Sequence, residues 1–511
     1  MPHSISEESA AGRLRFAGLV TTVFALLTVP RLLLHELWRD EAWQWLVVFE
    51  SRSFSDLFSG MSRGGGSGYL FPILAFLVRQ VWPSPRSMQL LHGTVASAAA
   101  FAFARWAPLG RRERALFVFG YFPFYEYAVI SRSYSAGALL VWLACAATRS
   151  RRPALALGAA LGLLFQTTVY GYILAIALAC GWLLDRWLHR REMPPLPWAE
   201  AAGGLVLAGA GAVAGLVQLT PAPGTQMLPW YFSWAPAPAL RVLRTPWRAF
   251  VPLPRPGLHF WNTNVLDAWP GAEAVAGLLT LALAAALLWR SKVALATFGL
   301  GTAGLFAFGY AYFPGVLRHQ GSLWILFAAA LWLGGGAAFG DDQEDRRSWR
   351  ARALLALLIL HCAVAAFASW MDLRHPFSNG AAAAELIRAK GLDRYPLLGH
   401  REPPAATVAL YLGRPLYSPS RKIFVTHPDW GPAQRELSEP EVRCAARELA
   451  LRGGKDIVLI RNKELPPWEE LDPAGSTRGA IEATEDYHLY RLRYSRLGPT
   501  AREAHCESKI E

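Results

Sequence analysis

A series of long apolar segments, separated by short charged loops, dominates the sequence. A helix needs about 20 predominantly apolar residues to span a bilayer, and the first run of this kind extends from Phe16 to Leu34. Charged residues make up 17% of the chain, whereas about a quarter is usual in a soluble domain. The pattern therefore predicts a polytopic membrane protein. The later apolar runs cover residues 69–82, 88–106, 115–130, 134–148, 154–169, 171–188, 199–219, 268–289, 293–313, 321–339 and 353–371.

Basic residues lie in short clusters at the ends of these runs, which accounts for the net charge of +13 without nucleic-acid binding. Cytoplasmic loops of membrane proteins carry an excess of Lys and Arg, and the clusters all fall on the cytoplasmic side only if the short run 69–82 does not cross. We therefore predict a mostly α-helical bundle of about eleven spans in the cytoplasmic (inner) membrane, with the N-terminus inside. The clusters are Arg111-Arg112-Arg114, Arg149-Arg151-Arg152, Arg186-Arg190-Arg191, Arg290-Lys292 and Arg346-Arg347-Arg350-Arg352.

The composition changes after the last apolar run, so we divide the chain into a transmembrane domain over 1–376 and a second domain over 377–511. Helices are expected near 380–390, 404–412 and 439–452, and strands near 396–399, 422–426, 456–460 and 487–493. This alternation predicts a small α/β domain outside the membrane. Cys444 and Cys506 in this part either form one disulfide or remain free thiols. No CxxC or metal-ligand spacing is present in the sequence.

The first predicted outer loop, His35 to Trp45, places Asp40 and Glu41 at a membrane boundary between tryptophans. Trp favours the headgroup level of a bilayer. A carboxylate held there is costly unless it is paired or used. The stretch is either an ordinary solvated loop or part of a working site.

A second group of unusual residues is expected at the outer face between the runs 115–130 and 134–148. Glu126 and Arg132 are charged residues in otherwise apolar surroundings, and Tyr134 follows them. Ionisable groups at such a depth are rare, are usually paired and often mark a functional site. The alternative is a structural Glu126–Arg132 ion pair that closes a helical hairpin.

Two further outer segments carry cations. Arg318 and His319 follow a Pro-Gly turn at the start of an apolar run, and this pair suits a phosphate or pyrophosphate group better than a metal. Arg241, Arg244 and Arg248 have the spacing of one helical face and either bind phosphate or lie on anionic lipid headgroups.

Glycines are dense in the segment from Arg63 to Gly68. A phosphate-binding loop would have to connect a strand to a helix N-terminus, and nothing here predicts that arrangement. We interpret the segment as conformational slack.

These features together favour chemistry at the outer membrane face. Transfer of a sugar from a lipid-phosphate donor needs a carboxylate that takes the acceptor's proton and cations that stabilise the departing phosphate. The alternative function is a lipid or lipid-linked-sugar flippase or transporter. Such proteins often show repeated halves and charges near the middle of the bilayer, whereas this sequence has no internal repeat and its charges gather at the predicted outer mouths.

The chain resembles the GT-C glycosyltransferases, and most nearly the branch of the protein O-mannosyltransferases and aminoarabinose transferases. The resemblance rests on the Asp40-Glu41 pair in the first outer loop, the Ser-Arg-Ser-Tyr sequence at 131–134, the many spans and the outer C-terminal domain. It covers the first 150 residues or so in motifs and the rest in layout. Where that branch carries a His-Pro-Pro-Leu-like element, this chain has Ser-Gly-Tyr-Leu-Phe-Pro at 67–72.

The resemblance implies a hexosyl- or pentosyltransferase that uses a polyprenyl-phosphate sugar as donor and an acceptor hydroxyl of a protein, lipid or glycan. It implies that Asp40 is the base and that Glu41 supports it or helps to bind an acceptor or a divalent metal. Arg132 and Arg318, with His319 beside the latter, are the residues expected at the donor phosphate. Glu126, Tyr134 and Arg244 are further candidate site residues.

Overall fold

The computed structural model describes residues 9–63, 67–225, 230–335, 348–431 and 435–497. The chain forms two compact units. Unit 1 consists of Met1–Leu33, Gly65–Pro221 and Leu228–Trp370, and unit 2 of Leu34–Gly64, Ala222–Met227 and Met371–Glu511. The segment that contains Asp40 and Glu41 therefore belongs to the same unit as the C-terminal part of the chain.

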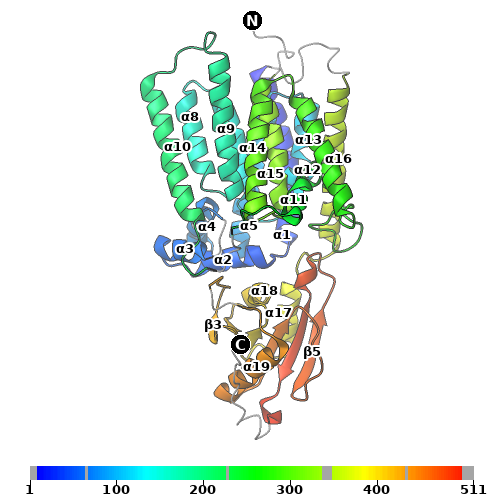
Figure 1. Ribbon diagram of the computed structural model, residues 1–511. Helices are drawn as coiled ribbons and strands as arrows, with labels where there is room; N and C mark the ends of the chain where they lie inside the picture. The colour runs from blue at the N-terminus through cyan, green and yellow to red at the C-terminus, as the bar shows by residue number, and fades with distance from the viewer. Residues whose placement is uncertain (1–8, 64–66, 226–229, 336–347, 432–434, 498–511) are drawn as a thin grey trace. The chain divides into compact units, whose positions relative to one another are not determined.

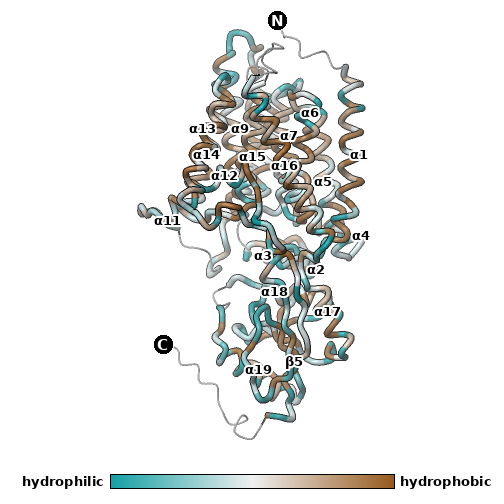
Figure 2. Tube along the Cα trace, turned by 90° about the vertical axis from the view of Figure 1, so that its right-hand side faces the viewer, coloured by the Kyte–Doolittle hydropathy of each residue, from teal (hydrophilic) through white to brown (hydrophobic). Residues whose placement is uncertain are grey.

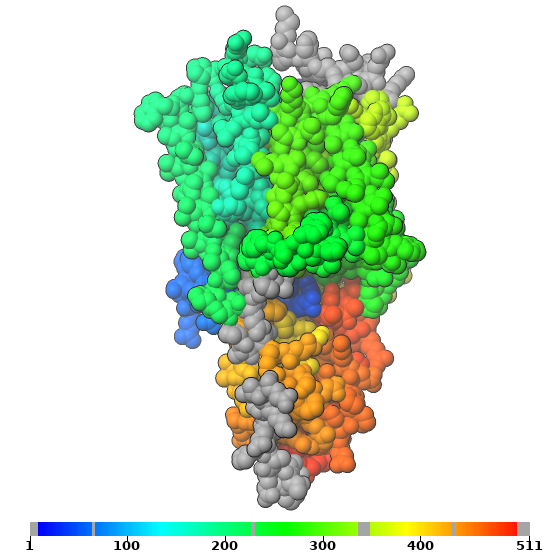
Figure 3. All heavy atoms as spheres, viewed as in Figure 1, coloured from blue at the N-terminus to red at the C-terminus, as the bar shows by residue number. Residues whose placement is uncertain are grey.

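Unit 1 is a bundle of helices (Figure 1). Its long helices are α1 (Ala10–Leu34), α5 (Pro85–Trp106), α9 (Val169–Leu188), α10 (Trp198–Leu219), α13 (Pro270–Leu288), α14 (Lys292–Ala311), α15 (Leu317–Gly334) and α16 (Trp349–Arg374). Its shorter helices are α4 (Leu70–Val81), α6 (Arg111–Val118), α7 (Tyr134–Ala147), α8 (Pro153–Leu164), α11 (Pro236–Leu243) and α12 (Thr245–Phe250). The segment that contains α11 lies across the end of α14 (Figures 1 and 3).

In the described part of the chain, six helices are long and apolar enough to cross a membrane: α1, α9, α10, α13, α14 and α16. Hydrophobic residues make up much of the length of these helices (Figure 2). On α10 the exposed side chains include Leu205, Val206, Val213 and Val217. A contiguous apolar face of this kind is unusual on a soluble protein. Unit 1 is therefore an integral membrane unit.

Several shorter apolar runs do not form full-length spanning helices. α4 has 12 residues, which rise about 18 Å, less than the roughly 30 Å hydrocarbon core. α8, within the run 154–169 that is expected to cross, also has 12 residues, and whether the run 69–82 crosses stays a prediction. The run 115–130 is broken, because α6 ends at Val118 and a π-helical turn follows over Tyr121–Glu126. Pro123 lies in that turn and has no backbone N–H to continue an α-helix. The number of eleven spans stays a prediction.

Unit 2 contains an α/β domain and the helices α2 (Arg39–Glu50) and α3 (Phe54–Ser62). The six-stranded sheet has the order β3-β2-β1-β4-β6-β5. β1 pairs in parallel with both β2 and β4, and the remaining pairs are antiparallel. The strands are β1 (Leu397–Gly399), β2 (Leu416–Ser418), β3 (Ile423–Val425), β4 (Ile457–Arg461), β5 (Leu471–Thr477) and β6 (Tyr487–Leu492), and the domain's helices are α17 (Gly380–Ala389), α18 (Glu402–Leu412) and α19 (Glu439–Gly453).

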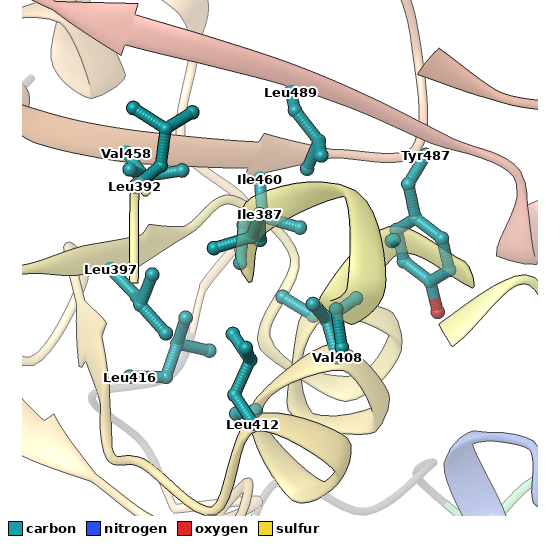
Figure 4. Packing of buried hydrophobic residues seen from close by; sticks show 14 of the residues in the cluster. Ile387, Leu392, Leu397, Val408, Leu412, Leu416, Val458, Ile460, Tyr487 and Leu489 are labelled. Carbon is teal, nitrogen blue, oxygen red and sulfur yellow. The ribbon is translucent and has the colours of Figure 1, made fainter. Parts of the chain in front are cut away.

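Both faces of the central strand β4 are buried. Alternate residues of β4 point to opposite faces, so Val458 packs with Ile387 of α17 and Val408 of α18 (Figure 4). Leu459 packs on the other face with Val442 of α19. A strand buried on both faces consists almost wholly of apolar residues, which is why β4 was predictable as a strand.

The helices and four of the strands of the α/β domain lie within a few residues of their predicted positions. Two strands were not predicted. β2 has only three residues, too few to show an alternating pattern. β5 contains Pro473 and Gly475, with a register shift between them, and both residue types weaken a strand signal.

The interpretation of the Arg63–Gly68 segment as slack is wrong for Gly68; residues 64–66 lie outside the described part of the chain. Gly68 donates its backbone N–H to the Thr167 carbonyl at 2.8 Å. A Cβ atom at this position would lie 2.1 Å from the Gln166 carbonyl oxygen. Glycine therefore allows the two backbones to approach closely.

Substitution Gly68→Ala should destabilise unit 1 by about 1–3 kcal/mol, because the added methyl group must displace backbone atoms. We expect a lower midpoint of thermal unfolding, measured by tryptophan fluorescence of the full-length protein in lipid nanodiscs. Gly209→Ala is the matched control, since a Cβ on that helical residue meets nothing within 4 Å. An equal effect of the two substitutions would contradict the close approach.

Candidate functional site

The first turn of α2 carries Asp40 and Glu41, and acidic residues are favoured there by the helix dipole. The start of α2 is held by the turn before β6. The backbone N–H of Arg39 donates to the Glu485 carboxyl at 2.7 Å, and the Arg39 Nη1 donates to the Thr484 hydroxyl at 2.8 Å. Glu485 thus satisfies a donor that has no partner inside the helix, and this contact fixes where Asp40 lies in unit 2.

Glu41 points into the protein and forms a buried triad with His35 and Asp372. His35 Nε2 lies 3.2 Å from Glu41 Oε2, and His35 Nδ1 lies 3.2 Å from both Asp372 carboxylate oxygens. The side chains of His35 and Glu41 are 0% exposed. Glu41 also accepts the backbone N–H of Trp38 at 3.3 Å. The triad joins the end of α1 to the end of α16.

Burial alone would lower the pKa of His35, but the charges and hydrogen bonds of Asp372 and Glu41 outweigh it and raise the pKa to about 10. His35 is therefore a cation at neutral pH, held between two carboxyl groups. Burial also raises the pKa of Glu485 to about 8, against the opposing effect of hydrogen bonds from Ser378 and from the Arg39 backbone. The surroundings of α2 are thus sensitive to alkaline pH.

Asp40 points away from the triad. Its side chain is 27% exposed and lies 4.0 Å from the Arg39 guanidinium. It lines a cavity of about 450 Å³ that is formed entirely by residues of unit 2. Neighbouring residues of a helix do not face each other, so the two adjacent carboxylates have different surroundings. Asp40 is the one that a ligand in this cavity can reach.

A divalent metal between Asp40 and Glu41 does not fit this arrangement, because Glu41 is directed at His35 and Trp38. Among the described residues, no group of three or more His, Cys, Asp or Glu side chains is placed to hold a metal ion. We derive no step through a metal.

In unit 1, Arg132, Arg318 and His319 form one cluster. The charges of both arginines act on the His319 ring. His319 accepts the backbone N–H of Val316 at 3.0 Å, and Arg132 Nη2 donates to the Ser67 hydroxyl at 3.4 Å. Ser67 is the first residue of the stretch 67–72 that this chain has in place of the His-Pro-Pro-Leu-like element. The structure therefore brings together the three residues that the sequence assigned to a phosphate.

Aromatic side chains surround this cluster. The Tyr134 and Tyr170 rings lie 5.7 and 5.0 Å from the His319 ring, measured between centroids. The Arg318 guanidinium lies over the Trp261 ring, 5.6 Å from its centroid, in a cation–π geometry. Tyr134, a predicted candidate, thus lies against the cluster, whereas Trp261 and Tyr170 were not predicted.

Glu126 is connected to the cluster through Trp261. The Trp261 indole N–H donates to the Glu126 carboxylate at 3.1 Å, and the Tyr121 hydroxyl donates to it at 2.8 Å. The side chain belongs to the π-helical turn and is buried. π-Helical turns often occur at functional sites, so this turn supplies a local reason why Glu126 is placed there.

Arg244 lies in a different network, at the α11–α12 boundary. It binds Glu273 of α13 and approaches Asp267 at 3.5 Å. Arg248 of α12 binds the same two carboxylates. These ion pairs hold the short helices α11 and α12 against α13. Arg244 therefore forms ion pairs within the protein. The sequence had suggested only two roles for it, binding of phosphate or contact with lipid headgroups.

Several of these contacts were not predicted because they join distant parts of the chain. His35 was within the Asp-Glu stretch, but its partner Asp372 lies 337 residues further on. The one available signal was an acidic residue directly after the last apolar run. Trp261 lies in a long loop rich in proline and tryptophan, where nothing in the local sequence distinguishes it from a tryptophan at the membrane interface.

The buried triad generates a pH prediction. The pKa of His35 is raised above its usual 6.5, so its stabilising effect is complete below pH 6.5 and is lost as the pH rises through about 10. Thermal stability in nanodiscs should therefore fall as the pH is raised from about 6.5 to about 10, and the contribution of His35 should level off above that.

Substitution His35→Gln should cost about 3–5 kcal/mol at neutral pH, because two carboxyl groups lose their buried cation, and should flatten the alkaline part of the stability profile. His259→Gln, at an exposed position, is the matched control. An unchanged alkaline profile in His35→Gln would mean that another group governs it.

Comparisons with known proteins show which solved structures have a similar fold. No family model matches the sequence, and no curated protein matches it. Two solved structures of ArnT from Cupriavidus metallidurans are similar. The structure bound to undecaprenyl phosphate superposes with a TM-score of 0.50 and 14% identity, covering 94% of this chain and 98% of that one.

The apo ArnT structure gives a TM-score of 0.51 at 14% identity and covers 96% of this chain and 100% of that one. ArnT is an aminoarabinose transferase of the GT-C type. The similarity extends over nearly the full length of both chains, so the expected resemblance to the GT-C membrane glycosyltransferases is confirmed at the level of the fold.

Proposed function

We propose that the protein transfers a sugar from a polyprenyl-phosphate-linked donor to an acceptor hydroxyl at the extracytoplasmic face of the membrane. One observation carries the proposal. A chain with the ArnT fold brings Arg132 and Arg318 to one histidine, His319, within an apolar helical unit. Fold alone does not establish function, so the proposal depends on this cluster.

The cluster has the chemistry that a lipid phosphate requires. Arginine binds phosphate through several charge-assisted hydrogen bonds in a fixed geometry. The repulsion between two neighbouring like charges is relieved when an anion joins them. The structure with the same fold that was solved with undecaprenyl phosphate is consistent with a ligand of this class.

The reaction that we propose is a direct displacement. The acceptor oxygen forms a bond to the anomeric carbon of the sugar while the bond from that carbon to the phosphate oxygen breaks. The acceptor hydroxyl loses its proton to a base, for which the sequence proposes Asp40 of unit 2, and the lipid phosphate leaves as an anion stabilised by cations, for which the sequence proposes Arg132 and Arg318 of unit 1. Glu41 acts through its place in the triad, where it helps to fix the start of α2.

Substitution Arg318→Gln should lower kcat/KM for the donor by about 100-fold, because a cation that stabilises the leaving phosphate is lost. The measurement is release of lipid phosphate from a panel of radiolabelled polyprenyl-phosphate sugars in proteoliposomes. Arg151→Gln, at an exposed position between α7 and α8 in the same unit, is the matched control and should behave as wild type. Equal kinetics of the two variants would argue against a phosphate site at Arg318.

Substitution Asp40→Asn should reduce sugar transfer at least about 100-fold, because an amide cannot accept the proton. Membrane insertion and thermal stability should not change, since the Asp40 side chain is partly exposed. Asp393→Asn, at an exposed position in unit 2, serves as the control. Retained transfer in Asp40→Asn would exclude this residue as the base.

The same assay distinguishes a transferase from the alternative function, a flippase. A transferase moves label from the lipid to a new product. A flippase leaves the label on the lipid and changes its leaflet, whatever residue occupies position 40.

A further inference from the structure

The cavity that Asp40 lines is formed by the loops at one edge of the sheet in unit 2. His400, Pro419 and Asn462 are the first residues after β1, β2 and β4, and all three line the cavity. These are the three parallel strands of the sheet. The cavity therefore lies at the carboxyl ends of all three, and its volume of about 450 Å³ is within the range of roughly 300–1,000 Å³ that is usual for small-ligand sites.

The chain order makes this edge a topological switch point. From β1 the chain passes through α18 to β2 on one side, and it later passes through α19 to β4 on the other side of β1. In open α/β sheets, ligands bind in the crevice outside the carboxyl ends of strands where the order reverses. Arg401 in this crevice has a φ of 60°, a strained conformation for a non-glycine residue that clusters at binding sites.

The charges that line the cavity are balanced in pairs. Arg39 lies beside Asp40, Arg401 binds Glu436, and Glu402 of α18 accepts from Arg421 at 2.9 Å. Arg435 binds Glu441. An anionic ligand would have to compete with a carboxylate at each of these arginines. The lining therefore differs from the arginine cluster of unit 1 and favours an uncharged ligand.

The remaining lining supplies what a sugar needs. Guanidinium and amide groups, such as those of Arg401 and Asn462, donate hydrogen bonds, and carboxylates accept them, so the hydroxyls of a sugar can do both. Trp430 is half-buried at the cavity and, with three neighbouring prolines, offers an apolar surface for the C–H face of a sugar ring. The prolines are Pro403, Pro404 and Pro419.

We propose that this cavity is the acceptor subsite and that it binds a neutral carbohydrate, one hydroxyl of which is presented to Asp40. The inference rests on the proposed function for the role of that hydroxyl. It adds the class of the acceptor, a neutral sugar rather than a phosphate-bearing group.

The test uses the full-length protein in lipid nanodiscs, because glycoside detergents would themselves carry the ligand group. The probes are methyl mannoside, methyl galactoside, methyl glucoside and methyl arabinoside, with inorganic phosphate as the anionic comparison. Binding is measured by saturation-transfer NMR and by calorimetric titration. We expect saturable binding of at least one glycoside and none of phosphate at this cavity.

Substitutions Trp430→Ala and Asn462→Ala should each weaken glycoside binding by about tenfold, which corresponds to the loss of one good contact. Two variants are used so that a folding defect in one does not decide the result. Lys455→Ala is the control, because Lys455 precedes β4 at the amino edge of the sheet, away from the cavity. It should bind as wild type.

The inference is wrong if none of the glycosides binds saturably, if glycoside binding is unchanged in both cavity variants, or if phosphate binding is weakened by both cavity variants. A donor assay on the same preparations distinguishes a failure of the acceptor subsite from a failure of the proposed function. Release of lipid phosphate without glycoside binding would overturn only the acceptor subsite. Glycoside binding that depends on Trp430 and Asn462, without any consumption of donor, would leave a carbohydrate site and overturn the transferase.

Discussion

The buried contact between His35 and its two carboxyl partners is the interaction on which the arrangement of the candidate base depends. It connects the end of the first long helix to the end of the last one, across 337 residues of sequence. Buried charges are expensive to desolvate and persist only when each is paired. Glu41 is held in this pairing, whereas Asp40, the preceding residue of the helix that begins at Arg39, lines the cavity.

The apolar runs and the alternating pattern of the C-terminal part were sufficient to predict most helices and four of the six strands. These elements are determined by local periodicity, so a single sequence reveals them. The failures have local causes as well. The break after α6 follows from Pro123 and from a π-helical turn that periodicity cannot show, and β5 is interrupted by Pro473 and Gly475.

The candidate site was predictable only in part, for a different reason. Residues such as Asp40 and Arg318 are conspicuous because a charge is rare beside apolar runs. Their partners are not conspicuous: Trp261 and Asp372 gain their roles from long-range contacts that no spacing in the sequence encodes. The prediction from sequence also placed Asp40 and Glu41 together in a loop. Once the segment is a helix, adjacent side chains diverge, and one of the two becomes structural.

The two units differ in how their charged side chains are arranged, and this difference affects which ligand each unit favours. In unit 1, two arginines act on the same histidine within an aromatic surround. In unit 2, every charged side chain that lines the cavity has an opposite charge beside it. An anion gains the most binding free energy where positive charges are brought together. A neutral polyhydroxy ligand gains the most where hydrogen-bond donors and acceptors alternate without net charge. If each unit selects its ligand in this way, a phosphorylated donor gains little in the cavity of unit 2 and an uncharged sugar gains little at the arginines of unit 1. Discrimination between donor and acceptor would then follow from the electrostatics of each unit by itself.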